Sequence, residues 1–186
     1  VYFRLVERTL PDLGQHRLVD KNPLNMLCLP MMLRLFPESR IILCLRHPCD
    51  VLLSCCMQSF RSPAFMVMCS SLERLARGYA QTFGQCCRHI EVFKPDVLEW
   101  RYESAVSHLD GEIARLGHFL EIADASPMRG FAEHAQRKRF IATPSYAQVT
   151  RPVDRAAVGR WEGYREHFEP VLPVLRPWIE RFGYDA

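Results

Sequence analysis

A short aliphatic run in the first third of the sequence constrains the fold more than any other feature. Residues 41–45 read Ile-Ile-Leu-Cys-Leu, which is typical of a strand buried in a parallel sheet. The Arg-His-Pro segment 46–48 ends this run, and a nearly all-apolar helix is expected over 48–60, with Asp50 in its first turn. The order strand, turn, helix predicts an α/β fold built on a parallel sheet.

The flanking segments repeat the alternation of strands and helices. A helix over 23–36 should bury an apolar face and be kinked by Pro30; that face consists of Leu24, Leu27, Met31 and Leu35. We find no internal repeat and no linker, so residues 1–186 should form one domain. Further strands are expected at 17–20 and 97–100, and further helices at 72–93, 106–120, near Phe131, at 155–165 and at 167–182.

Composition excludes several classes of protein. The chain has 186 residues, of which 48% are hydrophobic and 24% charged, and this is ordinary globular usage rather than that of a disordered chain. A net charge of +3 is too small for a general nucleic-acid binder. Residues 137–160, however, hold six basic side chains and one acid, Asp154. Such a segment suits a small oxyanion at least as well as a protein partner, although a solvated basic face is the first interpretation of a run like this.

The cysteine pattern predicts reduced thiols. Eight cysteines occur mostly inside apolar runs and form no CxxC pair, so a zinc site is not expected. Cys44, His47 and Cys49 could be read as metal ligands, but they lack a second pair. Thiols packed as small hydrophobes indicate a reducing compartment. Because no signal peptide and no apolar run of 18 residues is present, we expect a cytoplasmic protein without a membrane partner.

Polar residues follow the expected strands at the edge where parallel sheets bind ligands. Lys21 follows the first strand, Arg46 the second, with Ser54 eight residues later, and Tyr102 the third. Together they would suit a nucleotide with more than one anionic group. Each also has a structural interpretation, as a capped surface turn, a serine bonded to its own helix, or a core tyrosine. No GxGxxG or GxxxxGK motif occurs, which disfavours a dehydrogenase or kinase formed by this chain alone.

Three segments carry a resemblance to a known family. They read VDKNPLNMLCLPMMLRLFPESRIILCLRHPCDVLLSC, WRYESAV and TPSYAQVTRPVDRAAVGRW. In order and spacing they resemble the tyrosylprotein-sulfotransferase-like group of sulfotransferases, which includes bacterial members fused to tetratricopeptide repeats. The resemblance runs from about Leu18 to Tyr184. It implies a P-loop-like three-layer fold, with a parallel sheet flanked by helices, and transfer of a sulfuryl group from 3′-phosphoadenosine-5′-phosphosulfate to a hydroxyl on a protein tyrosine, sugar or small molecule, without a metal.

The resemblance also implies roles for particular residues. Arg46 and Ser54 resemble the pair that holds the 3′-phosphate of the donor, and Lys21 the lysine that assists transfer. Ser145 would lie on the phosphosulfate side and is counted with Lys21 as catalytic. Two departures are visible, since Gln58 stands where tyrosylprotein enzymes have another arginine, and an arginine replaces a lysine at position 160. The remaining donor-binding positions are Tyr102, Gln148, Arg151 and Arg160.

The family's amino-terminal strand, its Pro-Arg-Ser-Gly-Thr-Thr-like loop and its catalytic glutamate have no counterpart in this sequence. All three would precede Val1, so we expect the carboxyl-terminal majority of a sulfotransferase domain, with tetratricopeptide repeats as a candidate upstream partner. Asp20, Asp50 and Glu103 have no independent claim to be the base. A non-catalytic module that binds 3′-phosphoadenosine nucleotides stays open as the alternative. A nucleotide-kinase-like domain ranks last, because no carboxylate pair resembles a magnesium site.

Overall fold

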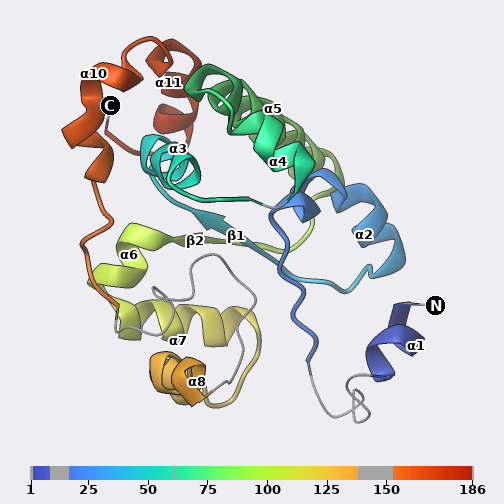
Figure 1. The fold of residues 1–186 in the computed structure, drawn as a ribbon. Helices are drawn as coiled ribbons and strands as arrows, with labels where there is room; N and C mark the ends of the chain where they lie inside the picture. Colours follow the sequence, from blue (N-terminus) through green and yellow to red (C-terminus); the bar gives the residue numbers. More distant parts are fainter. Residues whose placement is uncertain (1, 9–16, 61, 138–152, 186) are drawn as a thin grey trace.

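The structure, a computed structural model, describes residues 2–8, 17–60, 62–137 and 153–185 (Figure 1). The described part of the chain is mainly helical and contains one small sheet. Its elements are α1 (Tyr2–Glu7), η2 (Pro23–Leu27), α2 (Leu29–Leu35), β1 (Ile41–Leu45), α3 (Pro48–Cys56), α4 (Pro63–Met68), α5 (Leu72–Phe93), β2 (Val97–Arg101), α6 (Tyr102–Ser107), α7 (Leu109–Phe119), η3 (Ser126–Gly130), α8 (Phe131–Arg137), η4 (Arg160–Tyr164), α10 (Arg165–Phe168) and α11 (Leu172–Arg181).

The sheet within the described ranges consists of β1 and β2, which pair in parallel. The register runs from Ile41 opposite Val97 to Leu45 opposite Arg101, so both strands end at the same edge. The connection between them contains α3, α4 and α5, as a parallel pair requires. The predicted strand–helix–strand order is therefore confirmed over residues 41–101.

The strand predicted at 17–20 is wrong. These four residues are exposed and belong to no strand. The apolar pair Leu18 and Val19 satisfied the local pattern, but strand propensity depends on packing against neighbours and a ladder of hydrogen bonds. Neither β1 nor β2 pairs with this segment, so the pattern alone does not make it a strand.

Helix α5 follows its predicted bounds because both of its ends are specified locally. The Ser71 hydroxyl accepts the Arg74 N–H at 3.2 Å, which caps the first turn. At the other end Lys94 takes a left-handed conformation with φ of 46° and donates its N–H to the Ile90 carbonyl at 2.8 Å. Residues three or four apart then share one buried face: Leu75, Ala76, Tyr79, Cys86 and Cys87.

Two apolar clusters hold the elements together. In the larger one α3, α5 and α11 meet around Leu52, Leu175 and Ile179, none of which is exposed. In the smaller one Leu43 and Leu45 of β1 pack against α5 and the end of α11. Figure 1 shows α3, α5 and α11 on one side of the sheet and α6 and α7 on the other. The carboxyl ends of β1 and β2 therefore lie between helical layers.

The helix predicted over 23–36 is divided in the structure. Pro30 takes the second position of α2, where a missing N–H costs nothing, so the chain starts a new helix instead of kinking an old one. The break between η2 and α2 changes which apolar side chains face the interior. Leu29 is buried, whereas the predicted apolar face is 36–61% exposed and was therefore wrong: Leu24, Leu27, Met31 and Leu35.

Other predicted helices are shorter than the sequence pattern suggested. Helix α3 ends at Cys56, and burial is complete only in its first turns, since Met57 is exposed. The segment 106–120 falls into α6 and α7. The two helices predicted over 155–182 become η4, α10 and α11, although Pro177 inside α11 does not end it.

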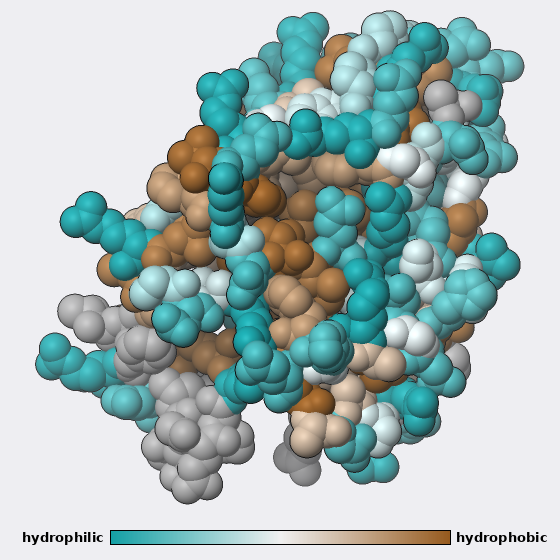
Figure 2. Space-filling view, turned by 180° about the vertical axis from the view of Figure 1, so that it is seen from behind, coloured by the Kyte–Doolittle hydropathy of each residue, from teal (hydrophilic) through white to brown (hydrophobic). Residues whose placement is uncertain are grey.

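The surface combines apolar and polar regions. Figure 2 shows apolar side chains gathered in a hollow on the face opposite that of Figure 1, framed by hydrophilic side chains. None of the helices in the described ranges combines the length and apolar character needed to cross a bilayer. All eight cysteines are free; Cys49, Cys86 and Cys87 are buried, while Cys28, Cys44 and Cys56 are exposed.

Candidate functional site

The turn between β1 and α3 places Arg46 at the carboxyl end of the sheet. His47 caps α3 by accepting the Cys49 N–H on its Nδ1 at 3.2 Å, and Pro48 takes the first helical position. The chain therefore changes from strand to helix within two residues. Because Leu45 pairs with Arg101, the residues that follow the two strands, Arg46 and Tyr102, become neighbours.

The guanidinium of Arg46 is held on several sides. Its Cζ lies 4.9 Å from the centre of the Tyr102 ring. One Nη donates to the Ala157 carbonyl and lies 3.8 Å from Asp50 Oδ2. The side chain is 20% exposed, and its buried Nε finds no hydrogen-bond partner among the residues that the structure describes. An unpaired buried donor on a charged group is costly, so this N–H is suited to an acceptor that a ligand would bring.

Asp50, four residues after Arg46, is completely buried. Its Oδ2 accepts the Gly159 N–H at 2.8 Å and its Oδ1 accepts the Trp161 N–H at 2.9 Å. These bonds tie the segment 157–161 to the first turn of α3. We call Arg46, Asp50, Tyr102 and the segment 157–161 the Arg46 cluster. Sequence reasoning missed the role of Asp50, and the only local signal was its spacing from Arg46.

Ser54 and Arg160 lie along the same side of α3 as Asp50. Ser54 comes one turn after Asp50 on the same helical face and is half-buried. Arg160 is exposed, and its Nη2 reaches the Sδ of Met57 at 3.5 Å, so its guanidinium lies near the carboxyl end of α3. The structure thus brings Arg46, Tyr102 and Arg160 to one region and puts Ser54 on the helix face beside them.

The pKa of the Tyr102 hydroxyl depends on its burial and on the charged groups around it. Burial raises the pKa of this hydroxyl, and the nearby Arg46 guanidinium opposes that rise. Asp154 acts on the same pKa in the raising direction, which shows that the approach to the segment 157–161 also lies within electrostatic reach of Tyr102. The ring therefore forms a flat, partly buried wall beneath a cation at the end of β2.

Lys21 lies outside the sheet, in the irregular segment before η2. It is exposed and directly precedes Asn22, whose side chain caps η2 by accepting the Leu24 N–H at 3.0 Å. Its charge lowers the pKa of Cys44, a smaller effect than the rise caused by burial of that thiol. The lysine thus acts electrostatically on Cys44, a residue of β1 two positions before Arg46. Within the described residues it forms no hydrogen bond or ion pair, and its part in the chemistry stays a prediction.

A second polar network closes the same edge of the sheet. Glu103 accepts the His47 N–H at 2.8 Å and the Tyr184 hydroxyl at 3.0 Å. The Nε2 of His47 lies 3.0 Å from the Asp185 carbonyl, and its ring stacks on Trp161 with centroids 5.1 Å apart. Burial raises the pKa of the Tyr184 hydroxyl. Glu103 therefore acts as a structural acceptor, and sequence reasoning did not assign it this partner set.

A family comparison decides what kind of protein forms this site. The model of the sulfotransferase family matches residues 3–126. The chain belongs to the sulfotransferase family. The match covers both strands, α3 and the predicted positions Lys21, Arg46, Ser54 and Tyr102. Arg160 lies beyond the matched residues and was assigned from the sequence resemblance.

The sulfotransferase chain is also similar to an uncharacterized protein of Aquifex aeolicus (strain VF5). The two are 24% identical over 171 residues, which cover 91% of this chain and 22% of the relative. The chain therefore spans about a fifth of the length of the relative that it matches.

Three predicted site residues of this sulfotransferase lie outside the described residues; these are Ser145, Gln148 and Arg151. The metal alternative at Cys44, His47 and Cys49 finds no geometric support, because both nitrogens of His47 contact backbone groups and Cys49 is fully buried. Among the residues that the structure describes, no group of three or more His, Cys, Asp or Glu side chains could hold a metal ion.

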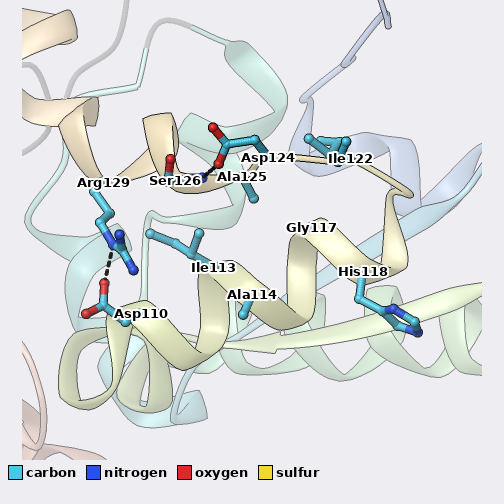
Figure 3. Close-up of a pocket in the computed structure, with 11 residues that line it drawn as sticks. Asp110, Ile113, Ala114, Gly117, His118, Ile122, Asp124, Ala125, Ser126 and Arg129 are labelled. Carbon is cyan, nitrogen blue, oxygen red and sulfur yellow. Dashed lines mark hydrogen bonds and ion pairs between the residues drawn. The ribbon is translucent and has the colours of Figure 1, made fainter.

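A cavity of about 250 Å³ lies between α7 and the turn that follows it (Figure 3). The two charged side chains at one end face each other, with Arg129 Nε 2.5 Å from Asp110 Oδ1. Gly117 permits the close approach of the turn, because a Cβ at that position would lie 2.7 Å from the Cβ of Ala125. The cavity shares no residue with the Arg46 cluster, and its charged pair is satisfied internally.

Proposed function

We propose that this sulfotransferase binds 3′-phosphoadenosine-5′-phosphosulfate at the Arg46 cluster and transfers its sulfuryl group to a hydroxyl acceptor. The observation that carries the proposal is the buried Nε of Arg46 at the carboxyl end of a parallel strand, which has no hydrogen-bond partner within the described ranges. A phosphate oxygen would satisfy this donor and gain a charge-assisted hydrogen bond. Ser54 would supply a hydroxyl to the same phosphate, and Arg160 a second cation.

Tyr102 adds a surface for the nucleoside. Its ring already packs against the Arg46 guanidinium, so a base or ribose beside it would contact a flat aromatic wall. The proposal also assigns donor contacts to Gln148 and Arg151, and assigns Ser145 to the phosphosulfate side of the site. The overall architecture that fits this assignment is the P-loop-like three-layer fold of the resemblance.

In the reaction, the acceptor oxygen attacks sulfur and forms a new S–O bond. The bond between sulfur and the bridging phosphate oxygen breaks and releases 3′,5′-bisphosphoadenosine, while the acceptor hydroxyl loses its proton to a base. Charge develops on the leaving oxygen, and the role proposed for Lys21 is to neutralise it. Asp50 and Glu103 are poor candidates for the base, because each carboxylate already accepts two hydrogen bonds from the protein.

Nucleotide binding tests the proposal directly. We expect calorimetry to show that 3′,5′-bisphosphoadenosine binds at least about tenfold more tightly than adenosine 5′-monophosphate, since only the former offers a 3′-phosphate. Equal affinities, or no binding of either, would contradict the assignment. Transfer of radiolabelled sulfate from the donor to a panel of tyrosine peptides, sugars and phenols would then identify the acceptor.

A non-catalytic nucleotide-binding module is the second candidate. It is favoured by the hydrogen bonds that Asp50 and Glu103 already accept from the protein, which leave neither carboxylate free to act as the base. Tight binding of 3′,5′-bisphosphoadenosine without sulfate transfer by the whole protein would decide for this module. The proposal also includes a cytoplasmic location, which cell fractionation would test. It further includes tetratricopeptide repeats elsewhere in the whole protein, which the sequence of the parent gene would reveal.

A further inference from the structure

Asp50 is the most deeply buried charged group of the described chain. Its carboxylate accepts hydrogen bonds from backbone N–H groups and is not available to a ligand. Its carboxylate has no solvent exposure and accepts two amide N–H bonds, from Gly159 at 2.8 Å and from Trp161 at 2.9 Å. Burial of a carboxylate is costly unless such bonds compensate for lost water. A residue that served packing alone would need no charge at this place.

The two bonded amides flank Arg160. Gly159 lies in the left-handed region with φ of 69°, so the chain turns sharply before Arg160. Trp161 after it is buried and stacked on the His47 ring. With both neighbouring peptides fixed to α3, the side chain of Arg160 is directed along that helix to Met57, where its Nη2 is 3.5 Å from the sulfur.

The ion pair between Asp50 and Arg46 is secondary by comparison. Their closest atoms are 3.8 Å apart, beyond hydrogen-bond length, and Oδ2 of Asp50 is already engaged by the Gly159 N–H. Neutralising Asp50 would remove a negative charge from beside Arg46. On electrostatic grounds alone this change would strengthen the attraction of Arg46 for a phosphate.

We infer that Asp50 is a positioning residue, which holds the turn at residues 159–161 so that Arg160 faces the donor nucleotide. The inference rests on the proposed function and adds to it a residue that does not touch the ligand. A positioning role for Asp50 predicts two effects of opposite sign on the affinity for the donor nucleotide. Loss of the turn geometry weakens donor binding through Arg160, whereas loss of the charge near Arg46 tightens it.

A double-mutant cycle on the whole protein tests this inference. Asp50→Asn is nearly isosteric but presents an NH₂ group to one of the two amides. We expect it to weaken binding of 3′,5′-bisphosphoadenosine by about tenfold, as Arg160→Ala does, because each would lose about one charge-assisted contact. In the Arg160→Ala background the same substitution should no longer weaken binding, because only the loss of negative charge beside Arg46 remains.

Glu103→Gln serves as the matched control, because Glu103 also accepts two hydrogen bonds at this edge of the sheet but touches neither Gly159 nor Trp161. It should leave the affinity within about twofold. An Asp50→Asn effect of equal size in both backgrounds, or an unchanged affinity or tighter binding when Arg160 is present, would overturn the positioning role. Failure of the unmodified protein to bind the nucleotide would instead reject the proposed function.

A second variant covers the case in which Asp50→Asn does not fold. Gly159→Ala disturbs the same turn from outside, because an added Cβ would lie 3.1 Å from Glu162 Oε1 at a backbone angle that side chains rarely adopt. We expect a several-fold loss of affinity that disappears when Arg160 is already alanine. Persistence of that loss in the Arg160→Ala background, or no loss at all, would also overturn the inference.

Discussion

Replacing Arg46 by alanine should weaken binding of 3′,5′-bisphosphoadenosine by about 10- to 100-fold. The guanidinium offers one buried N–H that no described residue accepts, and a hydrogen bond to a charged group is worth about 1.5–3 kcal/mol. At about 1.4 kcal/mol per tenfold change in Kd, this energy gives the stated range. Loss of the contact with the Tyr102 ring, at 4.9 Å, adds a smaller effect.

The fold should survive this substitution, because Asp50 keeps both of its amide donors. Isothermal titration of 3′,5′-bisphosphoadenosine and adenosine 5′-monophosphate would measure the effect. We expect the ratio of the two affinities to fall toward one, since Arg46 is assigned to the 3′-phosphate. Arg46→Lys keeps the charge but lacks the planar guanidinium, so its affinity for 3′,5′-bisphosphoadenosine should lie between those of the unmodified protein and Arg46→Ala.

Arg115→Ala is a suitable control for the loss of one arginine. Arg115 lies on α7 and bonds the Glu99 carbonyl and Glu112, each at 2.7 Å, away from the Arg46 cluster. It should leave both affinities unchanged. If Arg46→Ala binds the two nucleotides as well as the unmodified protein does, the unpartnered Nε is not a ligand donor and the proposed site is refuted.

Three further outcomes test other parts of the structure. Lys21→Ala should lower kcat for sulfate transfer by the whole protein far more than it raises the donor KM, because its charge is needed when the bridging oxygen leaves; equal changes in both would remove that role. Leu175→Ala should lower the free energy of unfolding by about 2–5 kcal/mol in urea titrations, since this side chain has no exposure and lies in the larger apolar cluster; a loss below about 1 kcal/mol would contradict that placement. Burial raises the pKa of Cys49 to about 12, so iodoacetamide at pH 8 should label exposed Cys28 well before Cys49, and mass spectrometry showing equal labelling would disprove its burial.

Elements with strong local signals were predicted well. The aliphatic run at β1 and the capped, periodic sequence of α5 determine their conformation within a few neighbouring residues. The crossover makes β1 and β2 parallel, and the observed register then brings Arg46 and Tyr102 together at the ends of these strands. The sequence could indicate that these two residues lie at one edge of the sheet, because hydrophobic patterning shows where each strand ends.

Contacts between residues far apart in the sequence could not be predicted in this way. Asp50 bonds amides 109 and 111 residues away, and nothing in the sequence near it specifies those partners. The apolar pattern over 23–36 likewise predicted a buried face, but Pro30 started a new helix and changed which side chains point inward. The partners of Asp50 depend on tertiary packing, and the buried side of α2 depends on where Pro30 starts the helix; the local apolar pattern specifies neither.

The last described residues of the chain fasten two helix starts to each other. The Tyr184 hydroxyl donates to Glu103, and the Asp185 carbonyl contacts the ring of His47, which lies 138 positions earlier in the chain. A clone that stops short of residue 184, or a protease that clips there, would release the start of α3 and the entry to α6 together. Loss of residues 184 and 185 would therefore loosen two helix starts at once, on the edge of the sheet where Arg46 and Tyr102 lie.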